Sequence, residues 1–211
     1  MHEPPIRPRQ RPGLLVAMLA GVGLLLAWSG YRPYELQTWV LEVSPAVVAI
    51  IVLLATRKRF PFSTLAYGLI AVHAVILIIG GHYTYARVPL GEWFRDTFEL
   101  SRNHYDRLGH FAQGFVPAIV TREVLIRTSP LNHSRWLGFL VVCVCTAISA
   151  VYELVEWGVA ELDEAGSAAF LGTQGDIWDT QKDMALCLIG ATVAVIALAR
   201  AHDHSMGRAR S

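Results

Sequence analysis

Nine acidic and histidine side chains stand out in this sequence because they lie in four short polar stretches that border long apolar runs. The stretches read "HYTYARVPLG" (82–91), "RNHYDRLGHFAQG" (102–114), "YELVEW" (152–157) and "GTQGDIWDTQKDM" (172–184). Carboxylate oxygens combined with one or two imidazoles suit Zn²⁺, Mn²⁺ or Fe²⁺. We therefore predict a divalent-metal site with ligands drawn from His82, His104, Asp106, His110, Glu153, Asp176 and Asp179. Glu156 and Asp183 would support these ligands or act as a catalytic general base.

The ionisable residues of each stretch are spaced as on one face of a helix, where side chains three or four positions apart are neighbours. Asp106 and His110 are four apart, and Glu153 and Glu156 are three apart. The aspartates of the fourth stretch fit the same pattern if the helix there begins early enough to include Asp176. An ionisable stripe that faces lipid is costly, so we expect these faces to point into the protein or into a water-filled cavity.

The six carboxylates of these stretches need compensation, because like charges at close range disfavour simultaneous ionisation. A bound cation is the first solution, and metal sites of this kind project Glu and His inward from facing helices. Protonation is the second, as in a proton-coupled carrier. The third is pairing with nearby basic side chains, for which the candidates are Arg95, Arg102, Arg107 and Lys182.

Some of these carboxylates also have explanations that need no ligand. Asp106 and Asp179 begin predicted helices, where the helix dipole favours anions. Glu153 and Glu156 end a helix, where the dipole disfavours anions, so their alternative explanation is a structural ion pair. Glu42 lies early in an apolar run and either joins the cluster or extends toward the membrane interface.

The apolar composition predicts an all-α, multi-pass membrane bundle. Hydrophobic residues make up 54% of the 211 residues and charged residues 17%, whereas soluble domains carry about 25% charged residues. We expect about six spans, and the one containing Asp106 is the least hydrophobic. The first run could instead be a signal peptide, but no clean small-residue cleavage pattern follows it. The expected spans are 14–30, 39–55, 62–81, 105–126, 136–157 and 179–200.

Basic residues predict the orientation of the bundle. If the N-terminus is cytoplasmic, twelve of the 18 Lys and Arg residues fall on the cytoplasmic side, which favours cytoplasmic termini by the positive-inside rule. The polar stretches then all face the outer side of the membrane. We divide the chain into a basic tail (1–13), a six-span domain with an outer polar pocket (14–200) and a second tail (201–211).

The remaining reactive side chains are expected to have structural roles. His73, in the middle of the third span, is expected to be a hydrogen-bonded core residue. His202 and His204 are expected to be solvated tail residues, because two isolated histidines make no closed metal site. The cysteines fall inside apolar runs and are expected to be buried without disulfides: Cys143, Cys145 and Cys187.

Two observations limit the functional classes. The net charge of +1 gives no indication of a nucleic-acid partner, so membrane lipids are the expected surroundings and no protein partner is indicated. The sequence contains no P-loop, G-x-S-x-G, H-E-x-x-H or C-x-x-C motif, so it lacks the signatures of a serine hydrolase or a standard zinc protease.

In their order between apolar spans, "HYTYARVPLG", "RNHYDRLGHFAQGFVPA", "YELVEW" and "GTQGDIWDTQKDM" resemble the YjdF-type inner-membrane proteins of bacteria. The resemblance covers roughly residues 10–200. It implies a multi-pass protein of the bacterial plasma membrane. It brings no established activity and no assigned ligands, so every functional role proposed here rests on the residues themselves.

The sequence thus predicts an integral membrane protein with a divalent-metal site at the outer face, built around Asp106, His110, Glu153 and Asp179. If the site is catalytic, the metal would activate water or polarise a phosphoryl or carbonyl oxygen. A hydrolase or transferase acting on a lipid or lipid-linked envelope molecule fits a site at that depth. A proton- or cation-coupled transporter is the first alternative, and a structural or accessory membrane subunit is the second.

Overall fold

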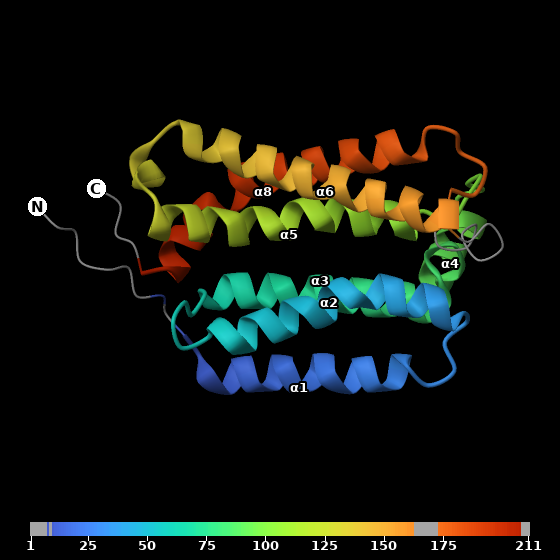
Figure 1. The fold of residues 1–211 in the computed structure, drawn as a ribbon, viewed down its shortest axis with the longest axis horizontal. Coiled ribbons are helices and arrows are strands. Elements are labelled where there is room, and N and C mark those ends of the chain that lie inside the picture. Colours follow the sequence, from blue (N-terminus) through green and yellow to red (C-terminus); the bar gives the residue numbers. More distant parts are fainter. Residues whose placement is uncertain (1–7, 9, 163–172, 208–211) are drawn as a thin grey trace, which may run out of the picture.

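The computed structural model describes residues 8, 10–162 and 173–207, and within these ranges every regular element is helical (Figure 1). Two short 3-10 helices cover Tyr85–Arg87 and Pro130–His133. The predicted all-α class is confirmed for this part of the chain. Its α-helices are α1 (Pro12–Ser29), α2 (Leu36–Thr56), α3 (Thr64–Tyr83), α4 (Pro89–Thr97), α5 (Tyr105–Thr128), α6 (Trp136–Leu162) and α8 (Asp179–Ser205).

Five of these helices are long and apolar enough to cross a membrane: α1, α2, α3, α6 and α8. They match five of the six predicted spans. The sixth, α5, is 24 residues long but carries charged residues near both of its ends, which lowers its mean hydropathy. It packs against three other long helices, α3, α6 and α8. Neighbouring helices therefore shield much of α5 from the surroundings.

The long helices form two groups that meet along α3 and α5 (Figure 1). In one group, α1 and α2 both pack on α3. In the other, α5, α6 and α8 pack on one another. The start of α1 and the end of α8 lie at the same end of the bundle, which we call the terminal end, and α4 lies at the opposite end, which we call the acidic end (Figure 1). The acidic end contains the starts of α5 and α8.

Two glycines allow α5 and α8 to approach closely. An added Cβ at Gly114 would lie 1.9 Å from the carbonyl oxygen of Cys187, and one at Gly190 would lie 2.2 Å from that of Phe111. Any larger residue at either position would force the two backbones apart. Gly114 is one turn beyond His110, so this contact also fixes the distance between the polar starts of the two helices.

Several buried side chains in the core between α3, α5, α6 and α8 are small, and many large apolar side chains lie on the outside. Ala66, Ala118, Cys145, Cys187 and Ala191 are all fully buried. The predicted burial of the cysteines is confirmed for Cys145 and Cys187, but Cys143 is exposed, and all three are free thiols. α6 has an exposed apolar surface, as a lipid-facing helix requires. This surface includes Val151, Leu154, Val155 and Trp157.

The prediction for His202 is wrong. α8 continues through Ser205, and His202 is completely buried. Its Nε2 donates to Glu123 at 3.1 Å, and its Nδ1 accepts from Arg122 at 2.9 Å. These two bonds define a neutral imidazole with the proton on Nε2. Helical spacing cannot predict this contact, because Glu123 and His202 lie 79 residues apart.

Glu123 is the centre of a buried network at the terminal end. Its carboxylate accepts from the backbone nitrogen of Ser63 at 2.9 and 3.1 Å, and from Arg127 at 2.9 Å. Arg122 extends the network to Asp203 at 2.8 Å. The network ties the start of α3, the end of α5 and the end of α8 together.

Candidate functional site

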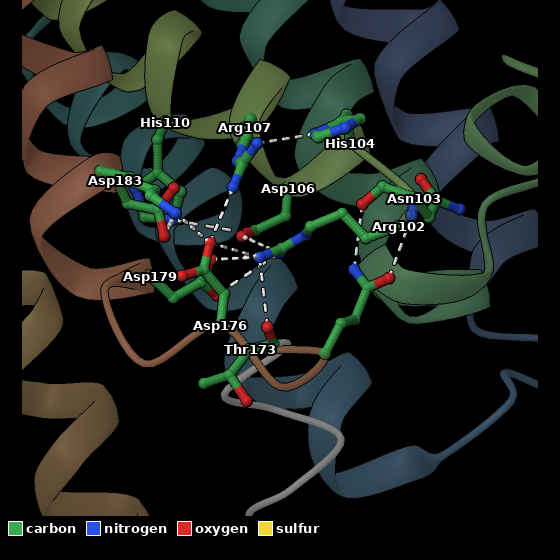
Figure 2. Close-up of polar contacts among 12 residues, drawn as sticks. Arg102, Asn103, His104, Asp106, Arg107, His110, Thr173, Asp176, Asp179 and Asp183 are labelled. Carbon is green, nitrogen blue, oxygen red and sulfur yellow. Dashed lines mark hydrogen bonds and ion pairs between the residues drawn. The ribbon is translucent and has the colours of Figure 1, made fainter. Parts of the chain in front are cut away.

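The acidic end gathers a group of carboxylates that we call the acidic cluster. α5 and α8 each contribute their first two turns (Figure 2). α6 contributes its last turns, and α2 contributes Glu42. The side chains on α6 point into the protein, since Glu153 and Glu156 are 7% and 8% exposed, while the neighbouring Leu154 is 63% exposed. The acidic cluster consists of Glu42, Asp106, His110, Glu153, Glu156, Asp179 and Asp183.

His110 lies at the centre of this cluster. Its Nε2 is 3.4 Å from Asp106 Oδ1 and 4.0 Å from Asp183 Oδ2. On the other edge of the ring, Nδ1 is 3.1 Å from the side-chain oxygen of Gln113 and 3.6 Å from Glu153 Oε1. One atom each of Asp106, His110 and Asp183 lie within 4.8 Å of one another, close enough to share one metal ion.

Gln113 sets the orientation of the imidazole. Its side-chain oxygen is an acceptor, so Nδ1 must carry the proton in this hydrogen bond. In the neutral ring, Nε2 then presents its lone pair toward Asp106 and Asp183. Metal-binding histidines are commonly held in this way, with the second ring nitrogen donating to a carbonyl or carboxylate. Gln113 was not among the predicted site residues, although its position three residues after His110 is compatible with such a role.

Two carboxylate oxygens of the cluster have no hydrogen-bond partner among the described residues. They are Glu153 Oε1 and Asp183 Oδ1, and both atoms are inaccessible to solvent. Asp183 as a whole is 3% exposed. Buried polar atoms without a partner are uncommon in folded proteins and each requires an explanation, such as an ion or a water molecule. These two oxygens are therefore available to a ligand.

Asp179 is already engaged by Arg102. The guanidinium donates to both carboxylate oxygens of Asp179 and lies 3.6 Å from Asp106. It also donates to the carbonyl of Thr173 at 3.2 Å (Figure 2). Arg102 is one of the basic residues that the sequence suggested as partners for the carboxylates. In the structure it pairs with them, and it is only 5% exposed.

Asp176 lies at the rim of the site and outside the helix. α8 begins at Asp179, so the condition that the helix include Asp176 is not met. Its carboxylate contacts Arg107 at 2.9 Å and Lys182 at 2.5 Å. The hydrogen bond from Lys182 is the main reason that the pKa of Asp176 is lowered. These contacts therefore stabilise the fold above the ordinary Asp pKa and are lost as the pH falls through the lowered pKa.

The two other predicted histidine ligands lie away from His110. His104 contacts Arg107 at 3.0 Å, and its pKa is lowered by partial burial and by that neighbouring guanidinium. His82 Nδ1 is 2.8 Å from the carbonyl oxygen of Ser29, and its ring lies 4.3 Å from that of Trp28. The contacts of His82 thus join α3 to the end of α1, and they leave it outside the acidic cluster.

Glu42 is buried within the acidic cluster and does not extend to the membrane interface. It is 5% exposed and interacts with the hydroxyl of Tyr85 and the charge of Asp106. Glycines make room for the Tyr85 ring, because an added Cβ at Gly80 or Gly109 would lie 2.7 or 3.0 Å from it. Sequence analysis missed this role of Tyr85.

His73 differs from the prediction of a hydrogen-bonded core histidine. Its Nε2 is buried and has no hydrogen-bond partner among the described residues. It lies ten residues before the end of α3, which is about 15 Å deeper than the acidic end by helical rise.

Asn103 holds the segment before α5 in place. Its backbone nitrogen and oxygen pair with the Gln174 side chain at 3.0 and 2.9 Å. Its own side chain donates to the carbonyl of Val88 and accepts from the backbone nitrogen of Tyr105. An added Cβ at Gly91 would collide with Asn103. Asn103 thus joins α4, the start of α5 and the turn before α8, and so positions the adjacent Arg102 (Figure 2).

The charge balance of the acidic cluster is unfavourable without a further cation or protons. It holds six carboxylates, and the buried basic side chains in contact with them are Arg102 and His110. Full ionisation would leave more negative than positive charge in a region shielded from water. Such an excess must be offset by a bound cation or by protonation.

A cavity of about 670 Å³ adjoins the cluster between α6 and the start of α8. Glu153 and Asp179 lie on its polar side, and Leu154, Trp157 and Ile177 line it with apolar side chains. These three apolar residues are also strongly exposed. The cavity therefore connects the carboxylates to the apolar outer surface of the protein.

Comparison with known proteins places the chain in a family. Residues 14–204 match the family described as "Predicted membrane protein (DUF2238)". The chain belongs to this family. It is 46% identical over 198 residues to "Inner membrane protein YjdF" of Escherichia coli (strain K12), a match that covers 94% of this chain and 95% of that protein. No solved structure matches the chain.

These matches confirm the predicted resemblance and the predicted location. The relative is an inner membrane protein, and the described part of this chain contains five helices suited to cross a membrane. The protein is thus a multi-pass protein of the bacterial inner membrane. Neither match names an activity, so the chemistry of the acidic cluster has to be argued from its geometry.

Proposed function

We propose that Asp106, His110 and Asp183 bind a divalent cation, with Zn²⁺, Mn²⁺ or Fe²⁺ as the candidates that suit this donor set. The observation that carries the proposal is the grouping of His110 Nε2 with two carboxylates, one of which has a buried oxygen without a partner. The hydrogen bond to Gln113 favours the tautomer that leaves Nε2 free to bind. Three protein ligands leave coordination positions open, as catalytic metal sites do.

The geometry supports an exchange of roles between two predicted residues. Asp179, predicted as a ligand, is bound by Arg102, so we assign it a positioning role. Asp183, predicted as a supporting residue or base, faces His110 Nε2 and becomes a ligand. Glu153 Oε1 lies 3.6 Å from the other ring nitrogen. It has no hydrogen-bond partner among the described residues, so it is free to contact a substrate or the metal's bound water.

An enzymatic function is favoured by the open site and its adjoining cavity. A bound cation would activate water or polarise a phosphoryl or carbonyl oxygen. Glu156, one turn beyond Glu153, is the candidate general base. The apolar wall of the cavity suits an amphiphile whose polar group reaches Glu153 and Asp179. This supports a hydrolase or transferase that acts on a lipid or lipid-linked envelope molecule.

Transport of protons or cations is the second candidate, and His73 is the observation that favours it. Its buried, unpaired Nε2 lies deeper in the bundle than the cluster. A carrier would need such a group between the cluster and the opposite side of the membrane. The concentration of the carboxylates at one end argues for the enzyme, because transporter sites lie near the middle of the membrane.

The proposed orientation places the acidic end outside and both termini in the cytoplasm, with α5 as a sixth span. In a chain whose Cys143, Cys145 and Cys187 are replaced by alanine, Asp96→Cys at the acidic end should react with a membrane-impermeant thiol reagent added to intact cells. Arg59→Cys at the terminal end should react only after the membrane is opened. Both side chains are exposed. The reverse pattern would contradict the orientation.

Metal binding is tested by titrating metal-stripped protein with Zn²⁺ and Mn²⁺ in a calorimeter. Wild-type protein should bind one equivalent. Gln113→Leu should weaken binding by about 10- to 100-fold, the usual effect of removing a partner that orients a metal-bound histidine. Asp176→Asn is the matched control and should leave the affinity unchanged, because Asp176 pairs with Arg107 and Lys182. Equal affinities for wild type and Gln113→Leu would show that Gln113 does not orient a metal-bound His110.

A further inference from the structure

The space between α1 and α2 is open at one end of the bundle and closed at the other. Both helices pack on α3 rather than on each other. At the acidic end they converge, because the indole nitrogen of Trp39 donates to the hydroxyl of Ser29 at 3.1 Å and the Trp39 ring packs over Gly30. Toward the terminal end they separate and leave a groove of about 510 Å³.

The groove has an apolar floor and a basic mouth. Its floor consists of short side chains, with Val22, Ala46 and Ala74 buried there. Arg57 and Lys58 line the mouth at the terminal end, where α2 ends, and both are exposed. No carboxylate is among the described residues that line the groove. The depth from Arg57 to Ala46 is eleven residues of helix, which corresponds to about 16 Å.

We propose that this groove is a binding site for an anionic phospholipid of the leaflet at the terminal end, with one acyl chain between α1 and α2 and the phosphate beside Arg57 and Lys58. In a bilayer the floor cannot be filled by water, because apolar helix surfaces at that depth contact hydrocarbon. The short side chains leave room for an acyl chain rather than for a helix. Basic pockets between membrane helices are suited to anionic head groups.

The inference is independent of the acidic cluster, since the groove lies on α1, α2 and α3 and its mouth is at the opposite end of the bundle (Figure 1). It also differs from general contact with surrounding lipid. Surrounding lipid would not discriminate between head groups at one position, and it would not depend on the space between two particular helices.

Native mass spectrometry of the whole protein tests the proposal. The protein is released from micelles that contain either dioleoyl-phosphatidylglycerol or dioleoyl-phosphatidylethanolamine. One phosphatidylglycerol should remain bound in preference to phosphatidylethanolamine. Arg57→Gln with Lys58→Gln should weaken retention of phosphatidylglycerol by about fivefold for each lost cation. Arg59→Gln is the matched control, because Arg59 is exposed on the same turn but does not line the groove, and it should change nothing.

The apolar part of the groove is tested separately. Ala71→Phe should fill the groove and reduce retention of both lipids, while Val72→Phe on the adjacent, exposed position should not. Equal retention of the two lipids, unaffected by all four variants, would mean surrounding lipid only and would overturn the proposal. A second result would also overturn the proposal. If the wild-type protein is a dimer and Ala71→Phe converts it to a monomer without loss of lipid, a second copy of the chain occupies the groove.

Discussion

Replacing Glu123 with alanine will lower the free energy of unfolding by about 3–5 kcal/mol, the cost of leaving a buried charge network without one partner. The carboxylate is 0% exposed and accepts from Ser63, Arg127 and His202. Ser63 and His202 are 0% exposed and cannot reach water in its place, whereas Arg127 keeps its hydrogen bond to the carbonyl of Pro61. The loss of one side chain therefore leaves a buried imidazole and a buried backbone amide without their acceptor.

Thermal unfolding of the purified protein measures this effect. Asp203→Asn is the comparison variant, because it removes one contact to Arg122 from the same network at a site that is 15% exposed, and it should cost about 1 kcal/mol or less. The double variant Glu123→Ala/His202→Ala should be less destabilised than the sum of the two single variants. If Glu123→Ala is no less stable than Asp203→Asn, the network does not hold the terminal end together.

Arg102→Gln will have the second large effect, again a loss of about 3–5 kcal/mol in the free energy of unfolding. Arg102 binds both carboxylate oxygens of Asp179 and lies 3.6 Å from Asp106. These groups are buried at the starts of α8 and α5, and without the guanidinium their charges repel each other. Any metal bound at the cluster should be lost as well, because Asp106 would lose its position.

Arg107 provides the matched control for Arg102. Its side chain is 25% exposed, against 5% for that of Arg102, and it pairs with the rim residue Asp176. Arg107→Gln should therefore cost about 1 kcal/mol or less. Adding Asp179→Asn to Arg102→Gln should restore part of the lost stability. Similar unfolding temperatures for Arg102→Gln and Arg107→Gln would refute the role assigned to Arg102.

The sequence predicted which side chains of the acidic cluster share an inward helix face. Helical spacing and the cost of placing charge in lipid decide this property. Glu153 and Glu156 share the inward face of α6, and His110 meets both Asp106 and Glu153. Helix periodicity fixes which side chains share a face, and burial energy fixes which face turns inward. These two constraints can be applied without knowledge of the fold.

The parts that the sequence did not predict depend on contacts between distant segments. Asn103 and Gln174 pair across 71 residues, and His202 reaches Glu123 across 79. The close approach at Gly114 and Gly190 sets which turn of α5 faces Asp183. Periodicity gives no information about such a helix register. For the same reason the proposed exchange of roles between Asp179 and Asp183 could not be predicted.

The most direct test of the proposed metal site is the metal content of protein purified without added metal. Elemental analysis should find about one equivalent of Zn, Mn or Fe in wild type and in the control Asp176→Asn. Asp183→Asn keeps the shape of the side chain but removes the charge beside His110 Nε2, so its metal content should fall to near zero while its unfolding temperature stays close to that of metal-stripped wild type. A wild-type protein without metal, or an Asp183→Asn variant that retains its metal, would contradict the proposed site.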